Sequence, residues 1–242
     1  MTYTPHDIEW TDEKVRRLWD YYGHASAYQE IYFSKVCGEV LLRRAGLNLS
    51  SMRLLDFGCG PGHMMPHVQR LFPGCEYHGL DFSFASTEAA KLKGRSYPVF
   101  KHIELVDTLP TPYKSAFFDV VLLIEVVEHL DDRHSQDTFS EISRITRKGG
   151  LLCVTTPNNE DLETLMLCCP DCGARYHMWQ HLRSWSARTM QDCVSGYGFK
   201  LVRKLEDNLR PMNPIERMAY WILTRLRKGT RRPHLLCVFE RI

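Results

Sequence analysis

Three closely spaced glycines follow a short apolar run and constrain the fold of this chain more than any other feature. The run Leu-Leu-Asp-Phe leads directly into Gly58, Gly60 and Gly62, with Cys59 between the first two. Glycines at a strand-to-helix turn can take positive φ and let the backbone approach a ligand closely. The spacing is G-x-G-x-G, which differs from the G-x-G-x-x-G loop that holds pyrophosphate at a helix N-terminus. Asp56, at the end of the apolar run, would repel phosphate and attract an ammonium group, so the loop favours a ligand with a cationic part.

A second apolar run, residues 75–83, also ends close to an acid. Asp81 lies 19 residues after Gly62, beyond an expected helix. A carboxylate at this place can accept hydrogen bonds from both hydroxyls of a ribose. The alternative is a tight turn beside an unrelated acid. The order of strand, glycines, helix, strand and acid favours a nucleotide-type cofactor.

Apolar and amphipathic patterns alternate along most of the chain. Short apolar runs predict strands over residues 52–58, 75–83, 100–106, 118–126, 150–158, 199–207 and 234–242. Helical spacing predicts helices over residues 11–46, 133–146, 186–198 and 215–232. Strands that alternate with helices predict an α/β fold whose mostly parallel sheet is covered on both faces.

Composition excludes several classes of protein. The 242 residues are 44% hydrophobic and 25% charged, which excludes a disordered or fibrous chain. Lys and Arg number 31 against 29 Asp and Glu, so any basic surface for nucleic acid would have to be local. No apolar run approaches the roughly 18 residues of a membrane span, and the N-terminus does not resemble a secretory signal. We therefore expect a cytoplasmic protein.

Several of these segments resemble class I S-adenosylmethionine-dependent methyltransferases between residues 50 and 160, with a weaker tail to residue 242. LLDFGCGPG resembles the first motif of that family, HGLDFS the second and FDVVLLIEVVEHL the strand-four motif. KGGLLCVTTPN is similar to the fifth strand. The resemblance implies a Rossmann-like, seven-stranded, mostly parallel sheet with one antiparallel strand, supplied by HLLCVFERI.

The resemblance also implies a binding site for S-adenosyl-L-methionine. Asp56 and the glycines would hold the methionine part, and Asp81 the ribose. For the adenine amino group, Glu104 and Asp107 both lie near Leu109-Pro110, and the choice between them stays open. The implied cofactor-binding residues are Asp56, Gly58, Cys59, Gly60, Gly62, Asp81, Phe82 and Glu125.

The same resemblance suggests how the chain is divided. Residues 1–46 would form an N-terminal helical lid, and residues 47–242 the methyltransferase domain. Two insertions are expected in that domain: a zinc-binding segment over residues 159–185 and a basic helical segment over residues 208–233. In related enzymes such N-terminal helices close over the cofactor, although most of the aromatic residues in this region are expected to pack against the sheet.

A group of acids and a histidine follows the fourth strand. Glu125, Glu128 and His129 stand at i, i+3 and i+4, which places them on one face if the chain turns helical there. Two carboxylates and an imidazole suit Mg²⁺, Mn²⁺ or Zn²⁺. Alternatively, they only line the site and cap a helix. The segment is similar to ubiquinone-pathway O-methyltransferases, and also to small-RNA ribose 2′-O-methyltransferases, in which Glu-x-x-Glu-His and a later histidine hold a divalent metal.

The sequence Cys169-Pro-Asp-Cys172-Gly resembles a zinc knuckle. His177 and His181 follow at i and i+4, so that the predicted zinc ligands are Cys169, Cys172, His177 and, less securely, His181. A redox pair or a chance spacing are the alternatives, and the adjacent Cys168 is another possible ligand. His181 lies in QHLRSW, which is similar to an acceptor-pocket segment of related methyltransferases. It would also supply the extra histidine for the Glu125 face, and it cannot easily serve both metals.

The basic segment over residues 215–232 allows four interpretations. It has apolar residues at helical spacing surrounded by arginines, which suits a membrane-surface helix, a lid over the acceptor or an RNA-contacting face. The fourth is a packed helix with a solvated basic side. We favour the lid, so membrane contact is possible but less favoured.

These patterns predict an enzyme that transfers a methyl group to an oxygen or nitrogen of a small-molecule acceptor. In-line transfer needs positioning and a deprotonated acceptor, and the catalytic candidates are His129, His181 and Glu128. An RNA ribose 2′-O-methyltransferase with a divalent metal at the Glu125, Glu128 and His129 face is the first alternative, disfavoured by the net charge of +2. A non-enzymatic zinc protein on the same fold is the second, disfavoured by the intact glycine loop and Asp81.

Overall fold

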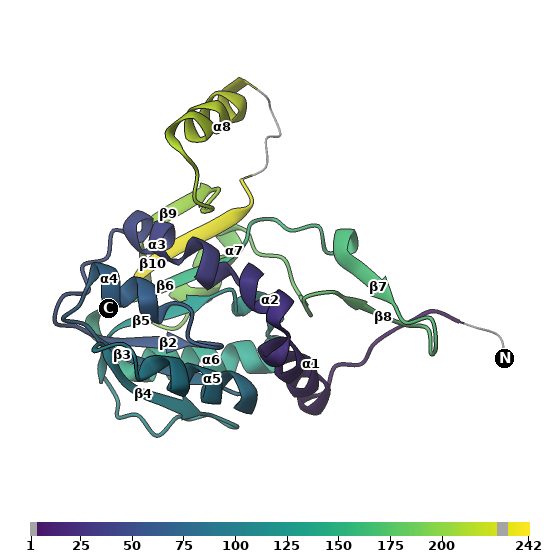
Figure 1. Ribbon diagram of the computed structural model, residues 1–242, viewed down its shortest axis with the longest axis horizontal. Coiled ribbons are helices and arrows are strands. Elements are labelled where there is room, and N and C mark those ends of the chain that lie inside the picture. The colour runs from purple at the N-terminus through teal and green to yellow at the C-terminus, as the bar shows by residue number, and fades with distance from the viewer. Residues whose placement is uncertain (1–3, 227–231) are drawn as a thin grey trace.

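The computed structural model describes residues 4–226 and 232–242, which form a seven-stranded sheet with helices on both faces (Figure 1). The strand order is β4-β3-β2-β5-β6-β10-β9. In chain order the strands are β2 (Arg53–Phe57), β3 (Glu76–Asp81), β4 (Phe100–Leu105), β5 (Phe118–Ile124), β6 (Thr146–Pro157), β9 (Phe199–Asp207) and β10 (His234–Arg241). Each corresponds to a strand expected from the sequence.

The last strand reverses the direction of the sheet. β10 pairs antiparallel with both β6 and β9, whereas the first five strands of the order pair parallel with their neighbours. The prediction of a mostly parallel, Rossmann-like sheet with an antiparallel strand at HLLCVFERI is confirmed. In parallel sheets of this kind ligands bind beyond the carboxyl ends of the strands, where the glycine loop and Asp81 lie.

Two hydrophobic cores cover the two faces of the sheet. One contains Leu54, Tyr77 and Leu122 and is covered by α3 (Phe33–Ala45), α4 (Met65–Leu71) and α5 (Phe84–Gly94). The other contains Leu55, Val121 and Leu123 and is covered by α6 (Asp132–Ile145) and α7 (Ala187–Ser195). Alternate residues of β2 and β5 point to opposite faces, as the pleat of a strand requires. No helix in the described part of the chain is long and apolar enough to cross a membrane.

The N-terminal region is helical, but it is broken into three pieces. These are α1 (Asp12–His24), α2 (Ser26–Ile31) and α3, with extended backbone at Ala25 and Tyr32 between them. Thr11 caps α1 by accepting a hydrogen bond from the Lys14 amide. The breaks let α1 and α2 turn across the ligand-binding edge of the sheet, while α3 stays in the core (Figure 1).

The segment over residues 159–185 forms a hairpin, which the sequence did not suggest. A 3₁₀ turn (Leu162–Leu165) leads into β7 (Met166–Cys168), which pairs antiparallel with β8 (Ala174–His177). β8 also pairs with β1 (His6–Asp7) in a small separate sheet. His177 therefore ends a strand and His181 lies in the following loop, so the prediction that they share a helical face is wrong.

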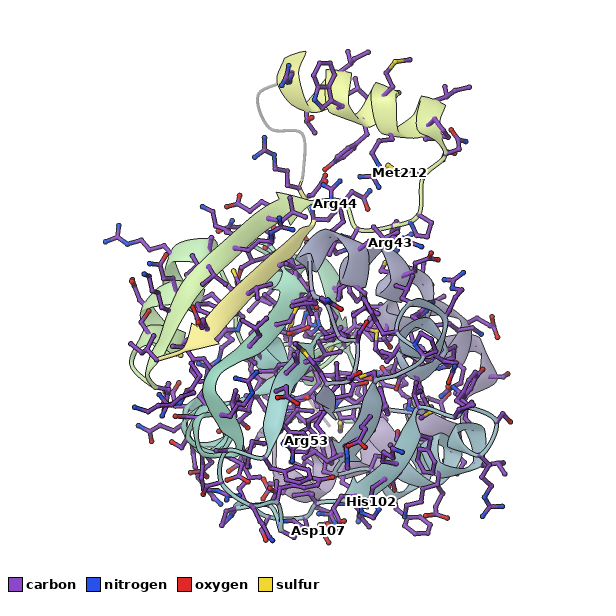
Figure 2. All side chains as sticks on the ribbon, turned by 90° about the vertical axis from the view of Figure 1, so that its left-hand side faces the viewer. Arg43, Arg44, Arg53, His102, Asp107 and Met212 are labelled. Atoms are coloured by element: carbon purple, nitrogen blue, oxygen red, sulfur yellow. The ribbon has the colours of Figure 1, made fainter. Side chains whose placement is uncertain are left out.

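The basic segment forms a helix as expected. α8 (Pro214–Leu226) lies between β9 and β10 in the chain and projects from the sheet in both views (Figure 1 and Figure 2). The end of the helix predicted over residues 215–232 lies outside the described residues, since these omit 227–231.

Candidate functional site

The glycine loop has the geometry of a ligand cradle. Gly58, Gly60 and Gly62 have φ values of 79°, 51° and 72°. A side chain at Gly58 would place its Cβ 2.7 Å from Cγ2 of Val126, whereas at Gly60 the nearest atom is Cε1 of Tyr32 at 3.4 Å. The loop therefore needs glycine for its conformation, and at Gly58 for the close approach of β5 as well.

Asp81 lies beside this loop and holds it in place. Its carboxylate accepts the backbone N–H of Gly60 at 2.8 Å and that of Ser83 at 2.9 Å. The side chain is 8% exposed, and burial raises the pKa of Asp81 above its usual value. Open backbone at Gly60 beside a carboxylate at the end of β3 fits a ribose-containing cofactor such as S-adenosylmethionine.

Asp56 is buried beneath the loop and has a defined partner. The Tyr77 hydroxyl donates a 2.5 Å hydrogen bond to Oδ2 of Asp56. Burial raises the pKa of Asp56 to about 7, although the hydrogen bond from Tyr77 acts in the opposite direction. Burial thus disfavours the ionised form of Asp56, and a cationic ligand group beside it would favour that form.

We expect Tyr77→Phe to lower the free energy of unfolding by about 1–3 kcal/mol, because a buried carboxyl loses its donor. The loss should be greater at pH 8 than at pH 5.5, since the ionised form of Asp56 depends more on that donor. Urea denaturation at the two pH values measures it. Tyr113→Phe is the matched control, because the buried Tyr113 hydroxyl has no hydrogen-bond partner. Equal losses in the two variants would contradict the assigned role of Tyr77.

The N-terminal helices contact the loop and the acid directly. Nε2 of His63, just after the loop, lies 2.9 Å from the side-chain oxygen of Gln29 in α2. The Ser83 hydroxyl donates to Asp20 of α1 at 2.6 Å. Burial and the charge of Asp81 raise the pKa of Tyr32, whose ring borders Gly60. Helices α1 and α2 thus cover the ligand-binding edge, as a lid would.

Acid should loosen this lid through His63. Burial, together with the Lys93 ammonium that donates to its Nδ1, lowers the pKa of His63 to about 3. Its contribution to stability is therefore complete above the unfolded pKa of about 6.5 and falls as the pH drops toward 3. Between pH 7 and pH 5 we expect the wild type to lose about 1–2 kcal/mol more than His63→Gln. Denaturant titrations at both pH values test this; parallel losses would contradict it.

Glu125, Glu128 and His129 begin a buried polar cluster at the end of β5. A 3₁₀ turn (Val127–His129) brings Glu128 inward, where it is 1% exposed and Oε2 accepts the Thr156 hydroxyl at 3.0 Å. Its other oxygen, Oε1, has no hydrogen-bond partner and lies 3.8 Å from Nε2 of His129. Burial raises the pKa of Glu125 to about 7, and burial and Glu125 together raise that of Glu128.

The hairpin segment brings further ligand atoms to this cluster. His181 packs edge-on against His129, with ring centroids 4.9 Å apart. Nδ1 of His181 lies 2.5 Å from Oε2 of Glu160. His177 stacks on His181 with centroids 4.4 Å apart. Burial, followed by His181, lowers the pKa of His129 to about 3, so the His129 ring is neutral and able to ligate a metal.

Two overlapping groups could hold a metal ion among the described residues. They are Glu128, His129 and His181, and Glu160, His177 and His181. Hydrogen bonds distinguish them. Nδ1 of His177 accepts the backbone N–H groups of Trp179 and His181, so the proton of neutral His177 sits on Nε2, the atom that faces Glu160. Nε2 is then not available as a ligand.

His181 has the opposite arrangement. Nδ1 of His181 faces Glu160, so the tautomer that donates from Nδ1 to this carboxylate leaves the lone pair on Nε2. A carboxylate on the far nitrogen is the usual orientation device of a metal-ligating histidine. The geometry therefore favours Glu128, His129 and His181 over the second group.

The structure does not assemble the four predicted zinc ligands. Within the described residues, neither Cys169 nor Cys172 belongs to a group of three or more candidate ligands. The two cysteines lie where β7 turns into β8, whereas His177 and His181 follow β8 and join Glu160. Backbone N–H groups of Cys172 and Asp171 lower the pKa of Cys169, as in a metal knuckle, but this pair supplies only half of a tetrahedral set.

Sequence reasoning missed the residues that join the lid to the cluster. Gln180 is buried, its Nε2 donates to the His129 carbonyl at 3.0 Å, and its Oε1 accepts from Trp19 of α1 at 3.2 Å. Glu160 was missed as well. Glu125, Asn159 and Gln180, at or beside the cluster, have positive φ values of 49–60°, a strain that is common at functional sites. The positions of Gln180 and Glu160 in the site depend on contacts between segments that are distant in the sequence, so local patterns do not indicate them.

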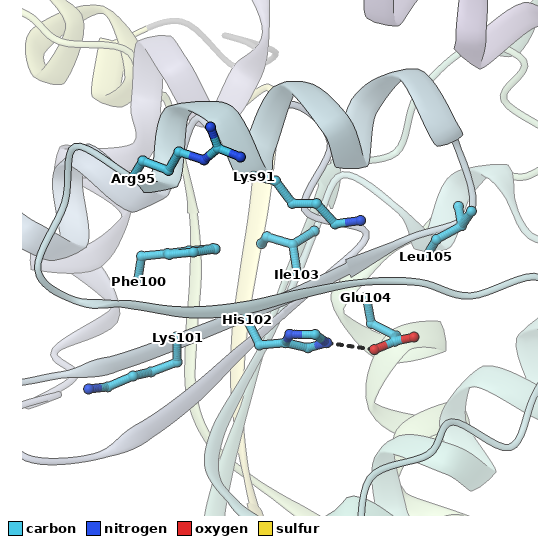
Figure 3. Close-up of a pocket in the computed structure, with 8 residues that line it drawn as sticks. All are labelled: Lys91, Arg95, Phe100, Lys101, His102, Ile103, Glu104 and Leu105. Atoms are coloured by element: carbon cyan, nitrogen blue, oxygen red, sulfur yellow. Dashed lines mark hydrogen bonds and ion pairs between the residues drawn. The ribbon is translucent and has the colours of Figure 1, made fainter.

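The two adenine candidates have different partners, and Val106, next to Asp107, donates its backbone N–H to the Asp81 carbonyl at 3.0 Å. Glu104 lies on β4 and accepts from His102 at 2.6 Å, and Asp107 pairs with Arg16 of α1 at 3.0 Å. Lys91, Phe100 and Glu104 line an open surface pocket of about 420 Å³ between α5 and β4 (Figure 3). Neither the glycine loop nor the cluster lines this pocket, so we do not assign it to the cofactor.

The comparison with known families settles the class of protein. The family described as a methyltransferase domain matches residues 28–204. The chain belongs to this family. The sequence-based prediction of a class I S-adenosylmethionine-dependent methyltransferase is confirmed.

Relatives of this methyltransferase share part of its length. A malonyl-[acyl-carrier protein] O-methyltransferase of Legionella pneumophila is 30% identical over 138 residues, which cover 55% of this chain and 46% of that protein. A ubiquinone biosynthesis O-methyltransferase of Mesorhizobium japonicum is 34% identical over 116 residues, covering 48% and 45%. The chain thus spans about half the length of these two curated relatives.

Structural similarity to known proteins covers more of the chain than sequence similarity does. The structure of a 1,6-didemethyltoxoflavin-N1-methyltransferase from Burkholderia thailandensis superposes with a TM-score of 0.65 at 13% identity, covering 98% of this methyltransferase and 94% of that chain. This likeness shows a shared fold and leaves the acceptor to be argued from the site.

Proposed function

We propose that this methyltransferase transfers the methyl group of S-adenosylmethionine to a hydroxyl oxygen of a small-molecule acceptor. The observation that carries the proposal is the buried Glu128, His129 and His181 group beside the glycine loop. The two are adjacent because Val126 fills the space next to Gly58. The O-methyltransferase names of the curated relatives also support transfer to oxygen.

Each part of the site has a task in such a reaction. When bound, the cofactor supplies a methyl group on a sulfonium, which an oxygen nucleophile attacks in line. The glycine loop and Asp81 bind and orient the cofactor, while α1 and α2 exclude water. The ring of His129 is neutral because its pKa is low, and Nε2 of His181 can carry a lone pair. Either nitrogen could take a proton from an acceptor hydroxyl.

We further propose that Glu128, His129 and His181 hold a divalent cation, with Glu160 orienting His181. Oε1 of Glu125 and Oε1 of Glu128 are buried without a hydrogen-bond partner in the described part of the chain, and Glu125 and Glu160 both act on Glu128 as like charges. A bound cation would give these oxygens a partner and balance the carboxylates. Such a metal would lower the pKa of an acceptor hydroxyl.

The other two functions are less well supported. An RNA ribose methyltransferase would share the metal group, but the net charge of +2 does not favour a nucleic-acid substrate. A zinc protein without activity rested on the four-ligand set that the structure does not assemble.

The test follows labelled methyl groups from S-adenosylmethionine into three acceptors: a catechol, an aliphatic amine and an RNA oligonucleotide. Enzyme is first treated with chelator and then supplied with Mg²⁺, Mn²⁺ or Zn²⁺. We expect label in the catechol, with stimulation by at least one metal. Label in the amine or the RNA alone would overturn transfer to a small-molecule hydroxyl, and equal rates with and without metal would overturn the cation site.

A further inference from the structure

Helix α8 docks on the body of the protein with its polar side. Arg217, Tyr220 and Thr224 are its partly buried residues, and their spacing of three and four residues puts them on one face. Nη1 of Arg217 lies 3.6 Å from Oδ2 of Asp207, at the end of β9. The contact between α8 and the body is therefore polar.

The other side of α8 is apolar and faces outward. Ile215 is 75% exposed and Met218 59% exposed. The exposed apolar residues, which we call the apolar arc, are Ile215, Met218, Trp221, Ile222 and Leu223. A surface helix normally turns such a face toward the core. Here the orientation is reversed, and α8 projects from the body in two views at right angles (Figure 1 and Figure 2).

Positive charge is found on α8 and on the segments beside it. The Arg225 guanidinium lies 3.9 Å from the centre of the Trp221 ring, and Arg210 and Arg232 are exposed on the two segments that lead to and from the helix. The sequence has no Asp or Glu between Glu216 and Glu240. A chain with a net charge of only +2 thus has a stretch without acids on and after the helix that carries the apolar arc.

We propose that the apolar arc and its arginines dock this methyltransferase on the surface of an anionic lipid bilayer. An outward apolar face with a tryptophan, bordered by arginines, suits the boundary between headgroups and acyl chains. A neutral protein partner would explain the apolar residues but not the absence of acids.

Docking there would also orient the site. His234, the first residue of β10, pairs with Pro157, the last residue of β6, so α8 leaves the sheet at the edge where the parallel strands end. This is the edge that carries the glycine loop and the buried cluster. Docking would therefore bring the ligand-binding edge near the bilayer. The docking itself does not depend on the reaction proposed above.

The experiment is co-sedimentation of the full chain with vesicles of phosphatidylcholine alone and of phosphatidylcholine mixed with phosphatidylglycerol, each at low and high salt. We expect binding to the anionic vesicles that weakens with salt. Arg225→Gln and Arg232→Gln should each lower the partition coefficient about fivefold. Met218→Glu combined with Ile222→Glu should lower it about 50-fold or more.

A matched control keeps the result specific. Leu92→Glu combined with Val202→Glu adds the same charge at two exposed apolar positions outside α8 and should leave binding within about twofold of wild type. No binding by the wild type, or equal losses in the control, would overturn the proposal. So would a dimer in sedimentation velocity that the α8 variant abolishes, since a second copy would then cover the arc. Loss of acceptor turnover without vesicle binding would assign α8 to a lid instead.

Discussion

Replacing His181 with glutamine is expected to lower the rate of methyl transfer by about 10²–10⁴-fold, with binding of S-adenosylmethionine within about twofold of wild type. Nε2 of His181 would either take a proton from the acceptor or bind the cation. Glutamine has no basic nitrogen to take a proton, and its amide replaces the imidazole ligand with a weaker oxygen ligand. Rates with saturating catechol and calorimetry with the cofactor measure the two effects separately.

His177→Gln is the matched control for this prediction. The His177 ring stacks on His181, but its Nδ1 accepts backbone N–H groups, so it is unsuited to act on the acceptor. We expect its rate to fall less than about tenfold. Equal losses in both variants would show that the stacked pair is only structural. Chelator separates the two roles of His181: treated wild type should resemble the variant if the histidine binds a metal, and should stay active if it is the base.

Replacing Asp81 with alanine is expected to weaken cofactor binding by about 10- to 150-fold, or about 1.5–3 kcal/mol for each charged hydrogen bond lost. The carboxylate lies at the end of β3, where it would accept from the ribose, and it also holds the Gly60 and Ser83 amides. Calorimetry with S-adenosylhomocysteine measures the change.

Partial unfolding of the Asp81→Ala variant could also lower its affinity for the cofactor. Two further variants therefore serve as controls. Glu76→Ala removes an exposed acid at the opposite end of the same strand and should bind normally. Asp81→Asn keeps an oxygen for one amide, so it should preserve the thermal unfolding temperature while still losing affinity. Unchanged affinity in both Asp81 variants would contradict its assignment to the ribose.

Local patterns in the sequence predicted the fold and the ligand-binding edge of the sheet, because each of these features depends on a short stretch of the chain. The apolar runs marked the strands of the sheet, and the glycines at 58, 60 and 62 all have the positive φ that their position suggested. The i, i+3 and i+4 spacing pointed to Glu125, Glu128 and His129. A 3₁₀ turn places Glu128 and His129 in a group of candidate metal ligands with His181, whereas Glu125 lies outside that group.

The rest of the site depends on contacts between distant segments. Trp19 and Gln180 are 161 positions apart in the sequence. The periodicity of apolar residues within a helix or strand cannot predict a contact over this distance. The four predicted zinc ligands are not brought together among the described residues, for a related reason. The prediction assumed that Cys169, Cys172, His177 and His181 share one compact unit, whereas a hairpin separates the cysteines from the histidines and a third partner, Glu160, comes from the loop before it.

The hydrogen bonds of Gln180 have a consequence for the order of ligand binding. Because one amide joins Trp19 of α1 to the His129 carbonyl, a shift of the N-terminal helices would be passed on to the buried polar cluster. Ordering α1 costs conformational entropy. If the first ligand to bind orders α1, the second ligand does not pay this cost again, and the two binding events are then cooperative. Thermodynamic reciprocity then requires acceptor and cofactor to tighten each other's binding by the same factor. Gln180→Ala should uncouple them and leave two independent affinities.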